Sequence, residues 1–453
     1  MSLTNVTNHK LSNLKNVIFK ENKEVFMRIL LIILAFNFII FIHELGHFLV
    51  AKLSGIKVEE FSMFVGPKLF SIKRGETQYS LRLFPILAYV KMEGEEEASD
   101  SDRAFSKKSV PIRAAVIAAG PLSNLIAAFV LITIYFFSVG FLNTTIDEVR
   151  DDSAAYKAGI RKGDQIVSYG NIPVYQRLDI FQFLYISKGE PTEITVKRQG
   201  IKEVLHITPE IKQYFLGFSP KDDPVKTNIV GSVSPDSPAE KAGMQAGDEI
   251  VKLNDVEVNA FKEISSFIQE NKENPIEITV IRDGAAKVIN ALPMKATEPS
   301  YDIGVAFEYE RGDIFETIKQ AALFTYSNAR MVPYTLAWLF QGKLNIFQMS
   351  GPVGIVTSMN DVVQQSPNIM DAILNLLSIT AFISIAVGAT NLIPFPALDG
   401  SKLVLILVEA VRRKPIPIEK EAVIMTIGFF LLIGLAIFIT SNDIFKLVER
   451  IAG

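Results

Sequence analysis

The stretch Ile42-His43-Glu44-Leu45-Gly46-His47-Phe48 lies inside an apolar run and contains the pattern H-E-x-x-H. On a helix, His43 and His47 project from the same face, where two neutral imidazoles can bind one Zn²⁺ ion. Glu44 then stands beside the ion as a candidate general base. Because the chain has only 4 histidines, a chance match is rare. The alternative interpretation is a pair of buried histidines that make structural hydrogen bonds.

A catalytic zinc site needs a third protein ligand, with the fourth position left for water. The chain has no cysteine, and His9 and His206 lie in polar segments. A carboxylate is therefore required, and Asp399 is the best candidate. It follows an apolar segment that ends at two helix-breaking residues, Pro394 and Pro396. The alternative is a solvated aspartate in a loop that ends a span.

Bulk composition predicts a membrane protein that also has soluble parts. The 453 residues combine a mean hydropathy of +0.27 with 21% charged residues. Apolar residues gather in segments of about 20 residues or more, the length that a bilayer core requires. We predict transmembrane helices at residues 27–53, 111–142, 369–394 and 422–441. The net charge of -3 gives no sign of a nucleic-acid partner.

The order of the spans brings Asp399 to the level of the histidines. The third span starts on the side of the soluble region that follows the second span, so Asp399 lies near the opposite face. The first span ends at that face too. His43 comes fifteen residues after Arg28, or about 22 Å along a helix at ~1.5 Å per residue. The two ligands can therefore meet.

Basic residues predict the orientation. The loops 52–113 and 395–421 contain eleven and five Lys/Arg residues, so the positive-inside rule places both in the cytoplasm. The active site would then lie towards the cytoplasmic face of the inner or plasma membrane. The basic N-terminal tail, residues 1–26, opposes this orientation. The sequence leaves open whether Met1 or Met27 begins the natural chain.

An internal repeat occupies the region between the second and third spans. Asp152–Val167 reads DSAAYKAGIRKGDQIV and Asp236–Val251 reads DSPAEKAGMQAGDEIV, at a constant offset of 84 residues. Each copy predicts a short helix that ends at Ala-Gly, then a Gly-Asp turn and a strand. The copies resemble PDZ domains of the bacterial, circularly permuted kind. The loops around Gly217 and Gly304 resemble the PDZ loop that receives a chain-terminal carboxylate.

The predicted fold class is a multi-pass α-helical membrane protein with four transmembrane helices, a membrane-associated β-hairpin and two α+β PDZ domains. Residues 57–72 and 77–92 predict the strands of the hairpin. The parts predicted besides the spans are a polar N-terminal tail at 1–26, a cytoplasmic or re-entrant hairpin region at 54–110, PDZ domains at 143–225 and 226–310, amphipathic or interfacial helices at 311–368, a cytoplasmic loop at 395–421 and a C-terminal tail at 442–453.

Three features together resemble the bacterial site-2 proteases, a family of intramembrane zinc metalloproteases, and especially the regulator-of-sigma-E protease type. They are H-E-L-G-H in the first span, the tandem PDZ copies, and N-L-I-P-F-P-A-L-D-G at Asn391–Gly400. The resemblance covers nearly the whole chain after the N-terminal tail. It implies that His43, His47 and Asp399 hold one zinc ion per chain, and that Glu44 is the catalytic acid and base.

The resemblance also predicts residues that contact substrate. Asn391 would bind or orient the substrate near the scissile bond, and Pro394, Pro396 and Asn124 are further substrate-binding candidates. The segment Gly120–Asn124 resembles the family's second-span motif, which packs beside the site.

These inferences predict an endopeptidase that cleaves single-span membrane proteins or remnant signal peptides within the membrane, after a first cut by another protease. Anti-sigma factors and signal peptides, as partners in stress-response signalling, are expectations from the resemblance, and membrane lipid surrounds the enzyme. The PDZ pair has two open uses, capture of a new C-terminus or exclusion of bulky substrates. A PDZ scaffold and a protease for soluble substrates are competing hypotheses. Glu44 argues against the first and the depth of His43 against the second.

Overall fold

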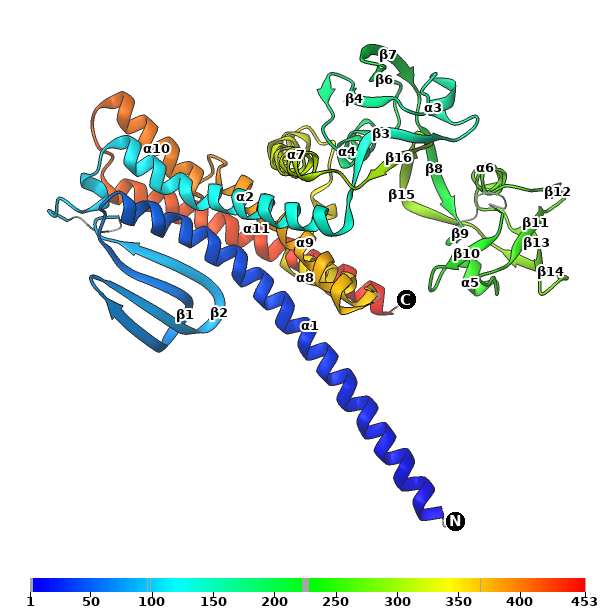
Figure 1. Cartoon of the computed structure of the whole chain (residues 1–453), viewed down its shortest axis with the longest axis horizontal. Coiled ribbons are helices and arrows are strands. Elements are labelled where there is room, and N and C mark those ends of the chain that lie inside the picture. The colour runs from blue at the N-terminus through cyan, green and yellow to red at the C-terminus, as the bar shows by residue number, and fades with distance from the viewer. Residues whose placement is uncertain (1–2, 96, 98, 222–227, 367, 453) are drawn as a thin grey trace. The chain divides into compact units, whose positions relative to one another are not determined.

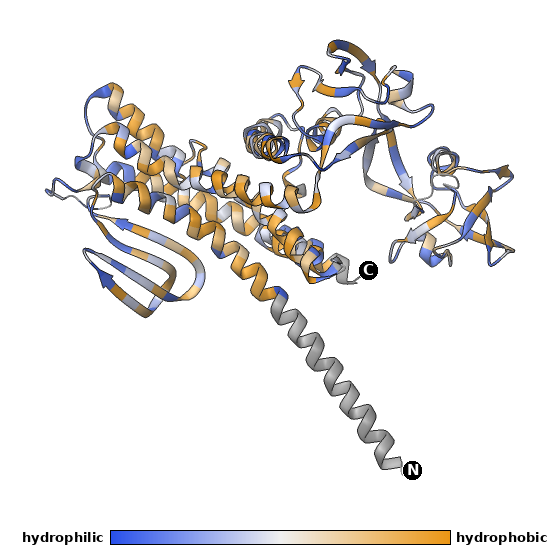
Figure 2. Ribbon diagram, viewed as in Figure 1, coloured by the Kyte–Doolittle hydropathy of each residue, from blue (hydrophilic) through white to orange (hydrophobic). Residues whose placement is uncertain are grey.

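Four helices form the candidate membrane-spanning part of the protein. The computed structural model describes residues 3–95, 97, 99–221, 228–366 and 368–452. Within these ranges, four helices are long and apolar enough to cross a membrane, and Figure 2 shows them as largely apolar ribbons. The candidate spans are Arg28–Leu53 in α1 (Leu3–Leu53), Val110–Val139, which is α2, Ile369–Asn391, which is α9, and Glu419–Val448 in α11 (Ile418–Ala452).

The N-terminal and second-span boundaries differ from the prediction. Helix α1 begins at Leu3, so the described part of the tail predicted at 1–26 is helical. That tail contains no glycine or proline that would interrupt the helix. The second span, predicted to reach residue 142, ends at Val139, because Gly140 takes a φ of 77° and terminates α2.

The C-terminal boundaries differ as well. The third span ends at Asn391 rather than at residue 394. The loop predicted at 395–421 contains a helix, α10 (Asp399–Arg412), which the prolines before it do not prevent because they precede its first turn. The described part of the tail predicted at 442–453 continues helix α11.

The predicted hairpin is present and is folded on itself. Its strands are β1 (Val58–Arg74) and β2 (Thr77–Met92). Glu60 lies opposite both Gln78 and Lys91, so the first half of β1 pairs with both halves of β2. The outer edges of this folded sheet are residues 68–74 and 88–92, which pair with no further strand in the described chain.

Aromatic residues attach the hairpin to helix α1. The ring of Phe61 in β1 lies 5.9 Å from that of Phe41 and 5.1 Å from that of Phe48, both in α1. Next to this contact, Met92 at the end of β2 packs in a buried cluster with Ala51 of α1. Figure 1 shows the hairpin beside the C-terminal part of α1, which contains the H-E-x-x-H motif.

Helix α2 packs against α1, α7, α9 and α10 and is the central helix of the bundle. Its buried Ala128 and Ile132 pack with Ala321 of α7 and with Ala381 and Ile385 of α9. The region predicted to hold interfacial helices at 311–368 does contain two helices. They are α7 (Ile314–Phe340) and α8 (Pro352–Gln365), with a short 3₁₀ turn, η2 (Ile346–Gln348), between them. Another 3₁₀ turn, η1 (Phe105–Lys107), precedes α2.

In the repeat unit, elements of the first copy recur 84 residues later, as the sequence predicts. The first copy contains α3 (Ala154–Lys157), β4 (Gln165–Tyr169), β5 (Ile172–Pro173), α4 (Arg177–Ser187), β6 (Thr192–Arg198) and β7 (Ile201–Ile207). The second contains α5 (Pro238–Lys241), β11 (Glu249–Leu253), β12 (Val256–Glu257), α6 (Phe261–Asn271), β13 (Ile276–Arg282) and β14 (Ala285–Ala291). Even the internal ion pair recurs, as Arg198–Asp164 and Arg282–Asp248.

The second copy is nested within the first. Strands β3 (Phe141–Val149) and β16 (Val305–Glu310) are neighbours in the first copy's sheet. Leu216 lies in the core of the second copy, next to the pair formed by β9 (Phe218–Pro220) and β10 (Val230–Val233). A ribbon of β8 (Glu210–Phe215) and β15 (Met294–Asp302) connects the copies.

This pairing corrects the division predicted at 143–225 and 226–310. Residues 216–221 and 228–291 belong to the second copy, and residues 302–310 complete the first. The repeat in the sequence locates the elements of each copy, but strand pairing between residues far apart in the chain decides which copy each terminal strand joins.

Candidate metal centre

The three predicted ligands meet inside the helical bundle. Asp399 Oδ2 lies 3.1 Å from His43 Nε2 and 3.6 Å from His47 Nε2, and the two Nε2 atoms are 3.3 Å apart. The ligand atoms of all three residues lie within 4.8 Å of one another. His47 is buried, and the side chains of His43 and Asp399 are only 12% and 18% exposed. Two imidazoles and a carboxylate are a donor set that suits a catalytic zinc ion.

A tight turn delivers Asp399 to the histidines. Helix α9 ends at Asn391, and Asp399 is the first residue of α10. Gly400 packs so closely on the carbonyl groups of Leu392 and Ile393 that a Cβ atom there would overlap them. Ser401 Oγ donates a hydrogen bond to the Leu398 carbonyl at 2.7 Å and fixes the first turn of α10. Ser401 thus supports the turn.

Two glycines let α1 and α2 approach closely beside the ligands. A Cβ atom on Gly46 would overlap the Ala119 carbonyl, and a Cβ atom on Gly120 would overlap the His47 ring. Ser123 Oγ spans the same contact and donates to the Ile42 carbonyl at 2.7 Å. The position of the His47 ring therefore depends on the absence of a side chain at residue 120.

Second partners orient both imidazole rings. His47 Nδ1 lies 2.8 Å from the Val116 carbonyl, which fixes Nδ1 as a donor and leaves Nε2 as the electron-pair donor for a metal. His43 Nδ1 lies 3.3 Å from the side-chain amide of fully buried Asn124. In the described chain Asn124 Oδ1 has no hydrogen-bond partner. Rotating this amide by 180° would let Oδ1 accept the proton of His43 Nδ1, as a metal bound at His43 Nε2 requires.

The residues present therefore fit a zinc ion, and Asn124 belongs to the support of His43. Asn124 was predicted to contact substrate, but it is fully buried between α1 and α9. Its backbone carbonyl accepts a 2.9 Å hydrogen bond from Ser384 Oγ. In the sequence, the signal for a functional role of Asn124 was a polar residue in an apolar span. Its partner, His43, becomes visible only where the two helices cross.

Asn124→Ala is expected to raise the zinc dissociation constant about 10- to 100-fold, because a ligand imidazole loses its orienting acceptor. Asn124→Asp keeps an acceptor oxygen and should stay within a few-fold of the unaltered protein. Competition with a chromophoric chelator in detergent measures both constants. Equal affinities for Asn124→Ala and the unaltered protein would contradict the orienting role.

Glu44 has the position of a general base. It adjoins His43 in α1 and interacts electrostatically with both histidines and with Asp399. Its carboxylate makes no hydrogen bond or ion pair with another residue that the structure describes. It is therefore free to exchange a proton at the site.

Asp399 carries a negative charge at neutral pH. Burial alone would raise the pKa of Asp399, but its contacts with His43 and His47 hold that pKa far below its ordinary value. A charged oxygen is the form that binds a divalent cation.

The three predicted substrate residues at the end of α9 and just beyond it have different surroundings. Asn391 lines an apolar groove of about 620 Å³ between α8 and α9, together with residues such as Ile355 and Phe382. Pro396 instead packs against Gly428 of α11, where a Cβ atom would overlap it. Pro394 is exposed. Asn391 is thus the predicted substrate residue that faces an open groove.

The two candidate ligand loops of the repeat unit are equivalent but belong to the opposite copies from those predicted. The Gly217 carbonyl accepts a hydrogen bond from Ser234 N in the second copy, and the Gly304 carbonyl accepts one from Arg150 N in the first. At Gly304 the N–H donates to Asp302 Oδ1 at 2.8 Å. The Gly217 N–H donates to no other residue in the described ranges.

The charge of Asp302 distinguishes the two loops further. Burial would raise the pKa of Asp302, but Lys212, whose Nζ lies 2.7 Å away, and Arg150 hold it below its ordinary value. A fixed carboxylate therefore already lies at the loop of the first copy.

Helices apolar enough to span a membrane, together with two histidines, an aspartate and an adjacent glutamate, are the arrangement expected of a membrane zinc metalloprotease. The chain belongs to peptidase family M50, whose sequence profile matches residues 31–435. Zinc metalloprotease RasP of Oceanobacillus iheyensis is 32% identical over 434 residues, which cover 92% of this chain and 98% of the relative. Regulator of sigma E protease of Haemophilus influenzae is 30% identical over 443 residues, which cover 92% and 98%.

These relatives confirm the predicted resemblance to site-2 proteases and the class of enzyme, a zinc metalloprotease of regulated intramembrane proteolysis. Among solved structures, the HtrA3 PDZ domain bound to a phage-derived ligand matches 21% of this chain and 92% of its own, at 23% identity. Its TM-score of 0.16 is too low to support an argument about fold.

Proposed function

We propose that the chain is an intramembrane endopeptidase with one zinc ion, which cleaves single-span membrane proteins or signal peptides left in the membrane after a first cut by another protease. The observation that carries this proposal is the convergence of His43, His47 and Asp399 beside Glu44, among helices apolar enough to span a bilayer. A ligand set at that depth acts on peptide bonds within or near the membrane.

When bound, zinc would lower the pKa of a coordinated water to about 7 and polarise the scissile carbonyl. Glu44 accepts the proton of the attacking water and donates it to the leaving amine. The Val116 carbonyl accepts the Nδ1 proton of His47 and leaves its Nε2 free for a metal, and the Asn124 amide, turned so that Oδ1 faces His43 Nδ1, would do the same for His43. Asn391 can donate its amide N–H to a substrate carbonyl from the groove that it lines.

A helical substrate must be unwound before its carbonyls can react, and unpaired backbone groups cost several kcal/mol each in lipid. The folded hairpin offers two edges, residues 68–74 and 88–92, that pair with no further strand among the residues described. An unwound substrate strand can pair with such an edge and so offset that cost. Residues 88–92 are the better candidate, since Met92 packs against Ala51 at the end of the helix that carries the histidines.

The test uses full-length protein in detergent with a single-span substrate. Cleavage is expected without chelator, to stop after zinc removal and to return when zinc is restored. Cleavage that persists without zinc would contradict the mechanism. A protein that binds zinc but cleaves no single-span substrate would favour the PDZ scaffold hypothesis.

Orientation follows from charge. The loops 52–113 and 395–421 carry eleven and five Lys/Arg residues, which favour the cytoplasm. The site would then lie towards the cytoplasmic face of the cell membrane, with the repeat unit outside the cytoplasm. On this assignment the two nested copies are PDZ domains, and the second copy captures the C-terminus that the first protease exposes, since the Gly217 N–H donates to no residue in the described ranges.

Gly217→Val is expected to weaken binding of a peptide with an apolar, free C-terminus at least tenfold, because the side chain would overlap Ser237 and distort the loop. Gly304→Val, which meets Ser153 in the same way, should leave this affinity unchanged. Fluorescence anisotropy of a labelled peptide on the full-length protein measures the effect, with the amidated peptide as control. Faster cleavage of substrates with intact ectodomains in Gly217→Val would instead indicate exclusion of bulky substrates.

A further inference from the structure

An ion pair lies one helical turn beyond the aspartate ligand. Lys402 is three residues after Asp399 in α10, so both side chains lie on the same face of the helix. Lys402 Nζ donates to Glu95 Oε1 at 2.8 Å, and the two side chains are 30% and 15% exposed. Neither residue belongs to the predicted ligand set.

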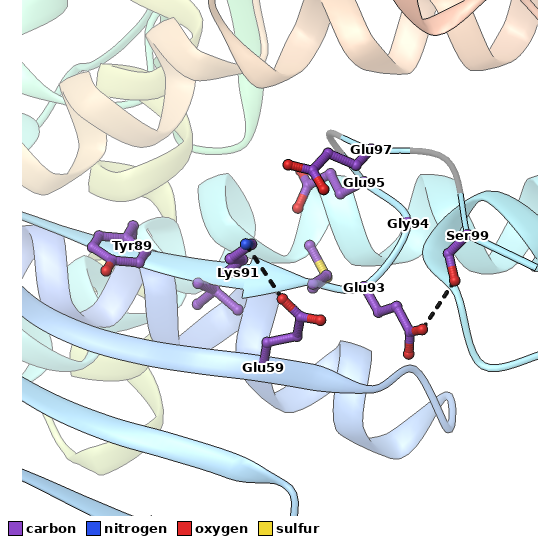
Figure 3. A pocket seen from close by; sticks show the side chains of 10 residues that line it. Glu59, Tyr89, Lys91, Glu93, Gly94, Glu95, Glu97 and Ser99 are labelled. Carbon is purple, nitrogen blue, oxygen red and sulfur yellow. Dashed lines mark hydrogen bonds and ion pairs between the residues drawn. The ribbon is translucent and has the colours of Figure 1, made fainter. Parts of the chain in front are cut away.

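The segment that carries Glu95 is fixed to the histidine helix. Glu93 N donates to the Lys57 carbonyl at 3.0 Å, and Phe105 N donates to the Glu93 carbonyl at 2.7 Å. Just before them, Met92 packs with Ala51 of α1. In Figure 3, Glu95 and Glu97 project to the same side of the turn at Gly94, whereas Glu93 points away towards Ser99. Glu95 therefore holds a defined position relative to α1.

Close packing alone does not hold the face of α10 that carries Asp399 and Lys402 in place. Lys402, Leu405, Ile406 and Glu409 line a cavity of about 410 Å³. The far end of α10 is held by Arg113 of α2, whose two terminal nitrogens bind the Glu409 carboxylate at 2.6 and 3.0 Å. At the end next to the zinc ligand, the corresponding attachment is Lys402 to Glu95.

Lys402 is a cation surrounded by carboxylates. Its ammonium interacts with the carboxylates of Glu95, Glu421 and Asp399. Glu95 and Asp399 also interact with Glu44. Burial would lower the pKa of Lys402, but these carboxylates raise it above its ordinary value, so the cation persists at neutral pH. Without it, like charges would push the first turn of α10 away from the loop.

We propose that Lys402 and Glu95 are a positioning pair, which fixes the first turn of α10 so that the Asp399 carboxylate meets the two histidines of α1. This inference rests on the proposed zinc function. It adds a connection between the acidic loop after the hairpin and the aspartate ligand, and it assigns a role to a cation that the chemistry does not otherwise use.

The test measures zinc affinity of full-length protein in detergent, by competition with a chromophoric chelator, together with thermal unfolding of the metal-free protein. Lys402→Met and Glu95→Gln are each expected to raise the zinc dissociation constant about tenfold or more, as loss of outer-sphere support does elsewhere. Lys402→Arg should stay within about threefold, because it keeps the charge and the donors. The reversed pair Glu95→Lys with Lys402→Glu should bind zinc better than either single reversal.

Lys107→Met is the matched control, since Lys107 lines the same cavity and, among the residues that the structure describes, forms an ion pair only with the exposed carboxylate of Asp100. It should leave zinc affinity unchanged. A lower unfolding temperature of metal-free Lys402→Met with unaltered zinc affinity would reduce the pair to a structural role and overturn the proposal. If Lys402→Met does not fold, Glu95→Gln and the reversed pair decide. Absence of zinc binding by the unaltered protein would overturn the proposed function as well, and is thus a separate outcome.

Discussion

Glu44→Gln is expected to lower the rate of peptide-bond cleavage about 10²- to 10⁴-fold, the range that a general acid–base group contributes. The substitution removes the proton acceptor but keeps the size of the side chain. Since Glu44 is not among the three ligands that converge, zinc affinity should change little. Single-turnover cleavage of a single-span substrate in detergent measures the rate, and chelator competition measures the affinity.

Glu97→Gln is the control for charge, because Glu97 is an exposed carboxylate in the acidic segment after the hairpin. It should cleave at the unaltered rate. Full cleavage by Glu44→Gln at full zinc occupancy would show that another group moves the proton. Loss of zinc together with loss of cleavage would make Glu44 a ligand rather than a base.

Gly120→Ala is expected to abolish zinc binding at micromolar metal and, with it, cleavage. The added methyl group would overlap the His47 ring, so the ring must turn away from the other two ligands. Intrinsic helix propensity favours alanine over glycine by about 1 kcal/mol, so a loss cannot come from a weaker helix. Bound zinc per chain, measured by atomic emission after gel filtration, reports the outcome.

Gly434→Ala is the matched control in another spanning helix, α11, because a Cβ atom there meets nothing within 4 Å. It should keep both zinc and activity. Normal zinc content in Gly120→Ala would mean that α2 can shift away from α1 without disturbing the ligands, which would remove the proposed importance of this helix contact.

The ligands could be predicted from the sequence because their chemistry leaves few choices. A spacing of four residues puts His43 and His47 on one helix face, and the lack of cysteine required a carboxylate. Counting spans then placed Asp399 at the same level as the histidines. The structure brings these three residues together. Local spacing and chain direction were sufficient for this part of the site.

The support of the ligands could not be predicted in the same way. Asn124 stood out as a polar residue in an apolar span, but its contact with His43 depends on how closely α1 and α2 cross. That distance is set by Gly46 and Gly120, which carry no chemical signal of their own. The attachment of Lys402 to Glu95 likewise joins residues separated by 307 positions in the chain.

Because the second copy is nested within the first, the phenotype of a deletion can be interpreted only when the deletion respects this nesting. A deletion of residues 143–225 removes Leu216 from the core of the second copy, although the rest of that copy stays in the chain. A deletion of 226–310 takes β16 from the sheet of the first copy. Either truncation damages both copies, and its phenotype would be assigned to the wrong one. Because β3 and β16 are neighbouring strands of one sheet, a deletion that spans both copies, from β3 to β16, removes the two together and leaves neither with a partial core.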